Sequence, residues 1–193
     1  GSVTVHDAGS GVRRATLEGH TGWVTSLAVA SNGTLLVSGS RDGTIVLWHV
    51  PSLELVGDLT ATAEVWSLAA VGDHHLAAGT ADGRIAVWHL PSRRCTRVMV
   101  HRGGVARALA ALPSGRLASV SGGDRLVRVW NVTRGTLVES LTLPSYAVSL
   151  GALHDGRLVV GCTNSAAYII TLTWERRRLA VVGWVAVRVV EWA

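Results

Sequence analysis

The chain has 193 residues, of which 48% are hydrophobic and 16% charged, and its formal net charge is +5 at pH 7. This length suits one domain of ordinary size, and because no apolar run reaches about 18 residues, no segment is expected to span a membrane. Two cysteines, Cys95 and Cys162, are too few for a disulfide framework, and no charged and apolar leader opens the chain. We therefore expect an intracellular, cytoplasmic protein with reduced thiols.

Taken in chain order, the first predicted elements are two short strands at Val3–Val5 and Arg13–Leu17. The next stretch, Leu17–Val50, holds three more strands, separated by a Ser-Asn-Gly turn and an Arg-Asp-Gly turn. Alternating apolar residues between such turns are the strongest short-range signal for antiparallel hairpins. A fourth, outer strand at Leu53–Leu59 completes a four-stranded unit, which is too small to bury both faces without neighbours.

The end of this unit recurs along the chain. Asp-Gly-Thr-Ile-Val-Leu-Trp-His-Val at residues 42–50 returns as Asp-Gly-Arg-Ile-Ala-Val-Trp-His-Leu at 82–90 and as Asp-Arg-Leu-Val-Arg-Val-Trp-Asn-Val at 124–132. The three tryptophans, Trp48, Trp88 and Trp130, are 40 and 42 residues apart, and fainter copies place His6 and Thr171 at the same position. A period of about 40–45 residues with four strands per unit is typical of a β-propeller.

The sequence therefore predicts an all-β propeller with about four full four-stranded blades, at residues 18–60, 61–100, 101–142 and 143–182. Partial blades are expected at both ends, in residues 1–17 and 183–193, because residues 183–190 overlay the innermost strand at 22–29. Two arrangements stay open: a five-bladed ring with an imperfect closing blade, and a segment of a larger propeller, which we favour. A segment has two open blade edges, at which self-association is expected.

The set Gly19-His20, Ser38, Asp42 and Trp48 resembles the pattern of the WD-repeat (WD40) β-propeller family, and the resemblance covers about residues 3–182. It implies a hydrogen-bonded relay in each blade, from the Trp indole to the Ser hydroxyl, to the His and to the Asp of the tight turn. Such a buried polar chain is stabilising only when every member has a partner. The residues expected to form the structural relay are His20, Ser38, Asp42, Trp48, Asp82, Trp88, His101, Ser119, Asp124 and Trp130.

Two blades depart from this pattern. In blade two, Thr62 lies near the His position and Ala78 takes the Ser position. In blade four no relay member is expected, and the four places are assigned to Pro144, Gly161, Ser165 and Thr171. We expect packing alone to hold blade four.

Catalysis and metal binding are not expected. The recurring Ser, His, Asp and Trp set belongs to several blades, whereas a catalytic triad would occur once. No His or Cys spacing is typical of a zinc site, and no glycine-rich phosphate loop leads into a helix. The sequence thus predicts a non-enzymatic protein without a cofactor.

The resemblance implies that partners bind at the narrow top of the ring, near the start of the innermost strands and the turn before the relay Asp. Aligning Leu27, Leu68, Leu109 and Leu150 sets the register of these strands. The residues gathered on that rim are Trp23, Arg41, Glu64, Trp66, Arg107 and Tyr146. Trp, Tyr and Arg dominate interface hot spots, so the predicted function is a scaffold within a multiprotein complex that binds a protein or peptide of acidic character. The alternative, that Trp23 and Trp66 pack between blades, stays open.

Arginine clusters at residues 13–14, 93–97 and 176–178 support a second hypothesis, an RNA- or ribonucleoprotein-associated propeller. All three clusters lie on outer strands or their flanking loops. We favour the reading that these arginines discourage edge-to-edge pairing, because the aromatic residues that single-stranded nucleic acid needs are absent there.

Overall fold

In the computed structural model, which describes residues 1–175 and 178–188, strands account for nearly all the regular structure, and one short 3-10 helix spans Ser31–Gly33. The strands form four four-stranded antiparallel sheets and one two-stranded sheet. No helix in these ranges is long and apolar enough to cross a membrane. The predicted all-β fold with four-stranded blades is confirmed.

The two-stranded sheet pairs β1 (Ser2–His6) with β2 (Arg13–Glu18). Blade one holds β3 (Val24–Ala30), β4 (Leu35–Ser40), β5 (Thr44–His49) and β6 (Glu54–Thr60). Blade two holds β7 (Val65–Val71), β8 (His75–Thr80), β9 (Arg84–His89) and β10 (Arg94–Val100). Blade three holds β11 (Ala106–Leu112), β12 (Arg116–Ser121), β13 (Leu126–Asn131) and β14 (Thr136–Thr142). Blade four holds β15 (Ala147–Ala152), β16 (Leu158–Cys162), β17 (Ala166–Glu175) and β18 (Arg178–Arg188).

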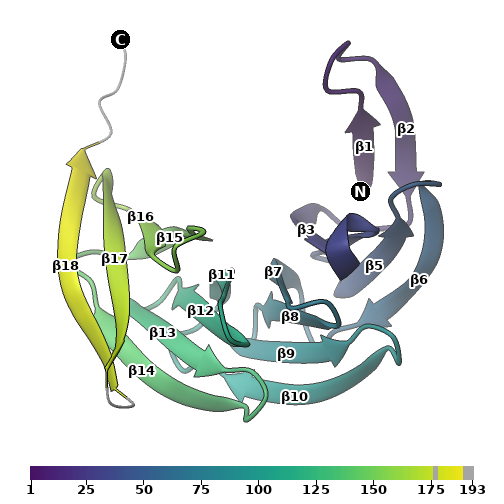
Figure 1. The fold of residues 1–193 in the computed structure, drawn as a ribbon. Helices are drawn as coiled ribbons and strands as arrows, with labels where there is room; N and C mark the ends of the chain where they lie inside the picture. The colour runs from purple at the N-terminus through teal and green to yellow at the C-terminus, as the bar shows by residue number, and fades with distance from the viewer. Residues whose placement is uncertain (176–177, 189–193) are drawn as a thin grey trace.

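The sheets stand side by side around an open arc, with β3, β7, β11 and β15 innermost and β6, β10, β14 and β18 outermost (Figure 1). The β1–β2 sheet lies at one end of the arc and blade four at the other, so the described residues do not close a ring (Figure 1). In blades one and two the turn before the third strand is set by an Asp followed by a glycine with positive φ, 81° at Gly43 and 77° at Gly83. Glycine adopts this conformation without the steric penalty that other residues incur.

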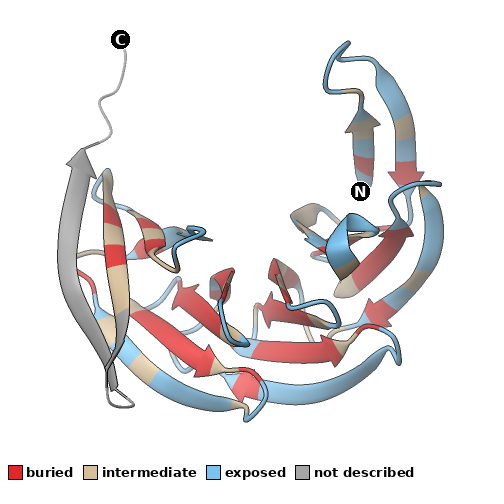
Figure 2. Cartoon of the chain, in the orientation of Figure 1, coloured by how far each residue is buried: buried red, intermediate tan, exposed pale blue. Residues whose placement is uncertain are grey.

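The core consists of separate apolar layers, each lying between two neighbouring sheets. Val37 and Ile45 of blade one pack with Val65 and Leu76 of blade two, and equivalent layers lie between blades two and three and between blades three and four. The middle strands of each blade are therefore the most buried (Figure 2). Because burying one such side chain stabilises the fold by roughly 1.5–3 kcal/mol, each blade depends on its neighbours.

The innermost strand of blade one is an exception to this burial. Leu27 is 51% exposed, whereas its repeat equivalent in blade two, Leu68, is 7% exposed because it packs on Gly39 of blade one. The sheet before blade one contributes only β1 and β2, so the strands that would cover Leu27 and its neighbour Val29 are not among the described residues.

One predicted element differs from the structure. Residues 183–190 were expected to begin another blade, but residues 183–188 continue β18 and pair with β17, with Trp184 opposite Ile170 and Arg188 opposite Ala166. The physical reason is the length of β17, whose free edge offers hydrogen-bonding groups along ten residues. Residues 189–193, and the predicted cluster members Arg176 and Arg177, lie outside the described residues.

Candidate functional site

Blade one contains a continuous chain of polar side chains. The Trp48 indole N–H donates to the Ser38 hydroxyl at 2.9 Å, and that hydroxyl lies 2.7 Å from Nε2 of His20. Nδ1 of His20 lies 2.9 Å from the Thr44 hydroxyl and 3.3 Å from Oδ2 of Asp42. The Thr44 hydroxyl itself donates to Asp42 at 2.6 Å. The structure thus brings together all four expected members and adds Thr44, which sequence analysis missed.

Asp42 fixes the loop before β3 to the turn after β4. Burial works to raise the pKa of this carboxyl group, but hydrogen bonds from the hydroxyl and N–H of Thr44 and from the N–H groups of Gly22 and Thr21 hold the pKa well below its usual range. The carboxylate therefore stays charged at neutral pH. Its role is to fasten two connections that lie beside the predicted rim.

Blade two keeps the turn but lacks the relay. Asp82 accepts hydrogen bonds from the hydroxyls of Thr80 at 2.5 Å and Thr62 at 3.0 Å, and it pairs with Arg84. The Trp88 indole is buried against Leu76, as Trp48 lies opposite Leu36 in blade one. The Ser position carries Ala78, which cannot accept a hydrogen bond from the indole.

The His position of blade two is occupied by Ala61, one residue before the Thr62 suggested by the sequence. The backbone identifies it: the N–H of Ala61 donates to the carbonyl of Gly43, just as the N–H of His101 donates to the carbonyl of Gly83. Thr62 instead reaches the turn Asp, so its hydroxyl supports the turn rather than a relay.

Blade three connects the same positions through an arginine. The Trp130 indole N–H donates to the Ser119 hydroxyl at 2.7 Å, so Ser119 occupies the Ser position. The Arg128 guanidinium lies 3.4 Å from both ring nitrogens of His101 and donates to Asp124 at 2.6 Å. Arg128 faces Ser119 across the sheet, at the place that Val46 occupies opposite Ser38 in blade one.

Burying this arginine changes the histidine beside it. Burial and, to a lesser degree, the Arg128 charge lower the pKa of His101 to about 4, while the Asp124 charge works in the opposite direction. His101 is therefore neutral at neutral pH. The missed signal was an arginine at the repeat position that the buried Val46 takes in blade one.

In blade four the expected positions are shifted by one residue. Leu158 lies opposite Ile170, as Leu36 lies opposite Trp48 in blade one, so Ile170 rather than Thr171 takes the Trp place. By the same register the Ser place belongs to Val160 and not to Gly161.

The turn of blade four shows the same shift. Asn164 accepts a hydrogen bond from the N–H of Ala166 at 3.3 Å, as Asp42 does from Thr44, so Asn164 rather than Ser165 takes the Asp place. Ser165, with a φ of 58°, stands at the glycine position.

The His position of blade four carries an apolar residue as well. The N–H of Leu143 donates to the carbonyl of Arg125, the bond that His101 makes to Gly83 in the preceding blade, so Leu143 rather than Pro144 takes this place. Leu143, Val160 and Ile170 are all buried in one apolar cluster. The expectation that blade four has no relay holds at these corrected positions.

The predicted rim residues lie at one end of successive sheets. The N–H of Arg41 donates to the carbonyl of Trp23 at 3.0 Å, and the N–H of Ala81 donates to the carbonyl of Glu64 at 2.9 Å. Thr163 makes the same contact with Tyr146 at 2.9 Å. The start of each innermost strand is thus bonded to the turn before the Asp place.

Three of the six rim residues form a stack that joins blades one and two. The Arg41 guanidinium carbon lies 4.9 Å from the centre of the Trp23 ring and 4.7 Å from the centre of the Trp66 ring. Trp23 is 72% exposed, so it does not pack between the blades, whereas Trp66 is partly buried and its indole nitrogen has no hydrogen-bond partner. Within the described ranges Arg41 pairs with no acidic side chain.

The other rim residues, Glu64, Arg107 and Tyr146, are exposed near the starts of their innermost strands, and within residues 1–172 no hydrogen bond, ion pair or ring contact joins their side chains to the stack. A metal centre is not indicated: the described residues hold no group of three or more His, Cys, Asp or Glu side chains that could bind a metal ion.

Comparisons with known proteins agree with this architecture. Residues 11–49, 53–89 and 93–131 match the family model described as WD domain, G-beta repeat. The chain is 62% identical over 40 residues to the small ribosomal subunit protein RACK1 of Schizosaccharomyces pombe, a match that covers 20% of this chain and 13% of that protein. It is 30% identical over 141 residues to pre-mRNA-processing factor 19 of Bos taurus, which is 71% of this chain and 28% of that protein.

Solved structures give the same fold. A chain of the mitotic checkpoint complex superposes with a TM-score of 0.82 at 25% identity, over 96% of this chain and 58% of that chain. The computationally designed Ika4 protein superposes with a TM-score of 0.68 at 25% identity, over 79% of this chain and 93% of that chain. The present chain spans less than a third of the curated relatives named here. Since the family model covers more than half of its residues, the chain belongs to the WD-repeat family of β-propeller proteins.

Proposed function

We propose that this protein is a non-enzymatic scaffold that binds a protein or peptide of acidic character through its rim. The proposed contact residues are Trp23, Arg41, Glu64, Trp66, Arg107 and Tyr146. The observation that carries this proposal is the stack in which Arg41 lies between two indoles without an acidic partner. Trp, Tyr and Arg are the residue types that contribute most binding energy at protein interfaces.

The chemistry of the stack explains the preference for acidic partners. Each cation–π contact holds the guanidinium by about 0.5–1 kcal/mol at an exposed site. The Arg41 side chain forms no hydrogen bond within the described residues, and the N–H groups of a guanidinium match the two oxygens of a carboxylate. Because the side chain is already held in place, binding costs less conformational entropy. Glu64 directly precedes β7, the innermost strand of blade two, and it would orient a basic group of the partner beside the partner's carboxylate.

The named relatives support a place in a multiprotein assembly. They include a small ribosomal subunit protein and a chain of the mitotic checkpoint complex. We extend from them only the general role, a scaffold inside an intracellular complex.

The test is a selection from a random peptide library displayed on phage, using the whole chain as bait. We expect the selected peptides to be enriched in Asp and Glu, and Arg41→Gln to weaken them about tenfold or more because a charge-assisted hydrogen bond is lost. The double variant Trp66→Ala with Arg107→Ala should weaken them further, with little change in melting temperature.

Arg13→Gln, on the outer strand β2, is the matched control and should leave peptide binding unchanged. Selected peptides without acidic residues, or equal effects of Arg41→Gln and Arg13→Gln, would contradict the proposal. A collapse of stability in the Trp66 and Arg107 variant would show instead that this part of the rim is core.

The second hypothesis, RNA binding by the outer arginines, is not favoured by their contacts. Arg14 forms an ion pair with Asp7, Arg93 donates to the carbonyl of Val56, and Arg97 donates to the carbonyl of Thr96. A steep fall of binding to one specific RNA with rising salt would revive this hypothesis.

A further inference from the structure

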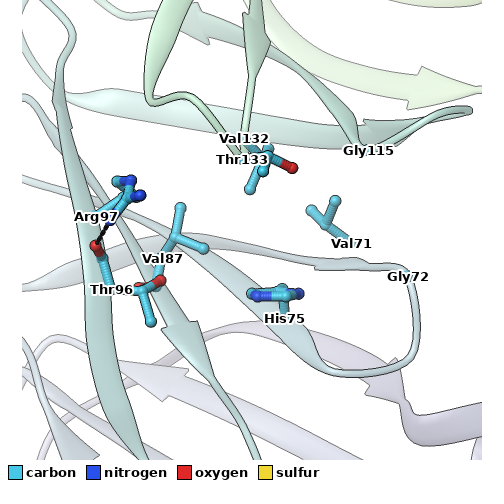
Figure 3. Close-up of a pocket in the computed structure, with 9 residues that line it drawn as sticks. All are labelled: Val71, Gly72, His75, Val87, Thr96, Arg97, Gly115, Val132 and Thr133. Atoms are coloured by element: carbon cyan, nitrogen blue, oxygen red, sulfur yellow. Dashed lines mark hydrogen bonds between the residues drawn. The ribbon is translucent and has the colours of Figure 1, made fainter.

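A groove lies between blades two and three, at the end of the strands opposite the rim. Its volume is about 370 Å³, and its apolar floor consists of Val71, Val87 and Val132, all buried. The side chains of His75, Arg97 and Thr133 lie around the same space (Figure 3). Both flanking blades are complete four-stranded sheets within the described residues, so the groove does not depend on the ends of the arc.

The polar groups around this groove are mostly without partners. One guanidinium nitrogen of Arg97 donates to the carbonyl of Thr96 at 2.7 Å, and the structure gives its other nitrogens no hydrogen bond. Neither the His75 ring nor the Thr133 hydroxyl forms a hydrogen bond within the described residues. Burial, and then the neighbouring His89 and His74, lower the pKa of His75, so its imidazole is neutral at neutral pH. The groove therefore offers one positive charge and two neutral polar groups over an apolar floor.

The repeat provides an internal comparison. The equivalent groove between blades one and two, of about 220 Å³, is lined by Leu35 and Pro91 where the larger groove has His75 and Thr133. The registers match, since Leu35 faces His49 as His75 faces His89. At these two positions the same backbone thus carries apolar side chains at one interface and an imidazole and a hydroxyl at the other, a difference that propeller packing alone does not require.

The two grooves also differ in how an arginine crosses them. Between blades one and two, the Arg93 side chain lies over Gly57 of β6 and donates a hydrogen bond to the carbonyl of Val56. Between blades two and three, Arg97 occupies the strand position equivalent to Gly57 and passes close to Gly135 of the next blade. Each arginine thus lies over a glycine of the neighbouring blade, and only Arg97 lines the same groove as His75 and Thr133.

We propose that the groove between blades two and three is a binding site for a small monocarboxylate with a branched aliphatic body. The carboxylate pairs with Arg97 and accepts hydrogen bonds from Thr133 and His75, while the aliphatic body covers the three valines. Pockets of about 300–1,000 Å³ with an apolar lining and a few polar groups are typical of small-molecule sites. A single cation balances one negative charge, which favours a carboxylate over a phosphate dianion.

Two sources share this chemistry, a free short-chain acid and the carboxyl-terminal residue of a peptide. The experiment is calorimetric titration of the whole chain with 3-methylbutanoate and with its neutral amide, and in parallel with N-acetyl-alanyl-valine and its carboxyl-terminal amide. We expect both acids to bind about tenfold or more tightly than their amides, because each amide loses the charged contact to Arg97. The acid that binds more tightly identifies the source.

Matched variants localise the site. Arg97→Gln should weaken the preferred acid about tenfold or more, and His75→Leu, the residue that blade one has, should weaken it severalfold. Arg93→Gln, in the groove between blades one and two, should leave binding unchanged, and Thr133→Val is a second groove variant that keeps the side-chain shape. Equal binding of acid and amide, equal effects of Arg93→Gln and Arg97→Gln, tighter binding of inorganic phosphate or no detectable binding would each overturn the proposal. The rim is not involved, so Arg41→Gln should have no effect here.

Discussion

Blade one and blade four have the same strand order but fill the centre of the sheet with different chemistry. In blade one the His, Ser and Trp places hold a buried hydrogen-bonded chain of His20, Ser38 and Trp48. In blade four the same three places hold only apolar side chains, which are Leu143, Val160 and Ile170. Both solutions leave no buried polar atom of these residues without a partner, so the relay is one way of building a blade rather than a requirement.

What all four blades share is the turn. Asp42, Asp82, Asp124 and Asn164 each accept a hydrogen bond from the N–H two residues further on, at 2.8, 3.3, 3.1 and 3.3 Å. The turn acceptor therefore persists where the relay is incomplete or absent. Substitutions in the polar relay, in the apolar centre of blade four and at the turn acceptor therefore test how far the blades differ in stability.

The largest effect is expected from a cavity in blade four. Ile170→Ala should lower the free energy of unfolding by about 2–5 kcal/mol, because Ile170 is fully buried and this blade has no side-chain relay to offset the lost packing. Chemical denaturation followed by circular dichroism measures the change. Leu137→Ala on β14, where the side chain is 48% exposed, is the control and should change it by less than about 0.5 kcal/mol. A small effect at Ile170 would mean that packing does not hold blade four.

The next effect concerns pH and blade three. The pKa of His101 falls from 6.5 to about 4 in the folded protein, chiefly because of burial, so the unfolded chain binds this proton more readily. The free energy of unfolding should therefore be unaffected by this group above about pH 6.5 and should fall between about pH 6.5 and pH 4. At about 1.4 kcal/mol per pKa unit, the loss is on the order of 3 kcal/mol.

The variant His101→Leu isolates this contribution, because it places at the His position the residue that blade four has. Denaturant titrations at several pH values should show a flatter dependence for the variant over that window. Identical pH profiles for the variant and the parent protein would contradict the buried neutral state of His101.

A smaller effect is expected at the turn acceptor. Asp42→Ala should lower the free energy of unfolding by about 1–3 kcal/mol, because the N–H groups of Thr21, Gly22 and Thr44 lose their acceptor and His20 loses its charged neighbour. Asn164→Ala in blade four is the matched change and should cost less than Asp42→Ala, since one backbone N–H loses its acceptor and the Tyr168 hydroxyl loses one neutral donor, against three backbone N–H groups and a charged neighbour at Asp42. Equal costs at the two positions would mean that the relay adds nothing to the turn.

The sequence predicted the fold and the first three blades because their markers are local. Alternating strands, Asp-Gly turns and the tryptophans at a period near 41 specify which residues face the core. Blade four has no Trp marker and carries Ser165 in place of the turn glycine, so counting by the period placed its members one residue too late. Arg128 was missed because an arginine in a strand normally indicates a solvent-exposed position. Its burial depends on pairing with Asp124.

Other features depend on the three-dimensional arrangement of the blades and could not be predicted from the sequence. Residues 183–188 look like an innermost strand by composition, but the free edge of β17 decides where they pair. The rim was predictable as a set of strand starts, whereas the position of Arg41 between the rings of Trp23 and Trp66 depends on the angle between two blades. Sequence periodicity carries no information about such angles.

The smallest expected effect on stability concerns one backbone position, the residue after the turn acceptor, in blades one and four. Ser165 of blade four has a φ of 58°, and Gly43 of blade one has a φ of 81° at the equivalent place. A residue with a Cβ atom is strained in this region by roughly 1 kcal/mol, whereas glycine is not. Ser165→Gly should therefore raise the free energy of unfolding by up to about 1 kcal/mol, offset in part by the greater freedom of glycine in the unfolded chain.

The reciprocal change, Gly43→Ser, should lower the free energy of unfolding by about 1 kcal/mol through backbone strain alone. A Cβ atom at Gly43 would approach the carbonyl oxygen of Ala63 to 3.6 Å, which is an ordinary contact, so no steric clash adds to the strain. Opposite signs for the two substitutions, measured by the same denaturant titrations, are the expected result. If both substitutions destabilise the protein, Ser165 holds its turn by a contact that glycine cannot supply, and the turns of the two blades are then not equivalent.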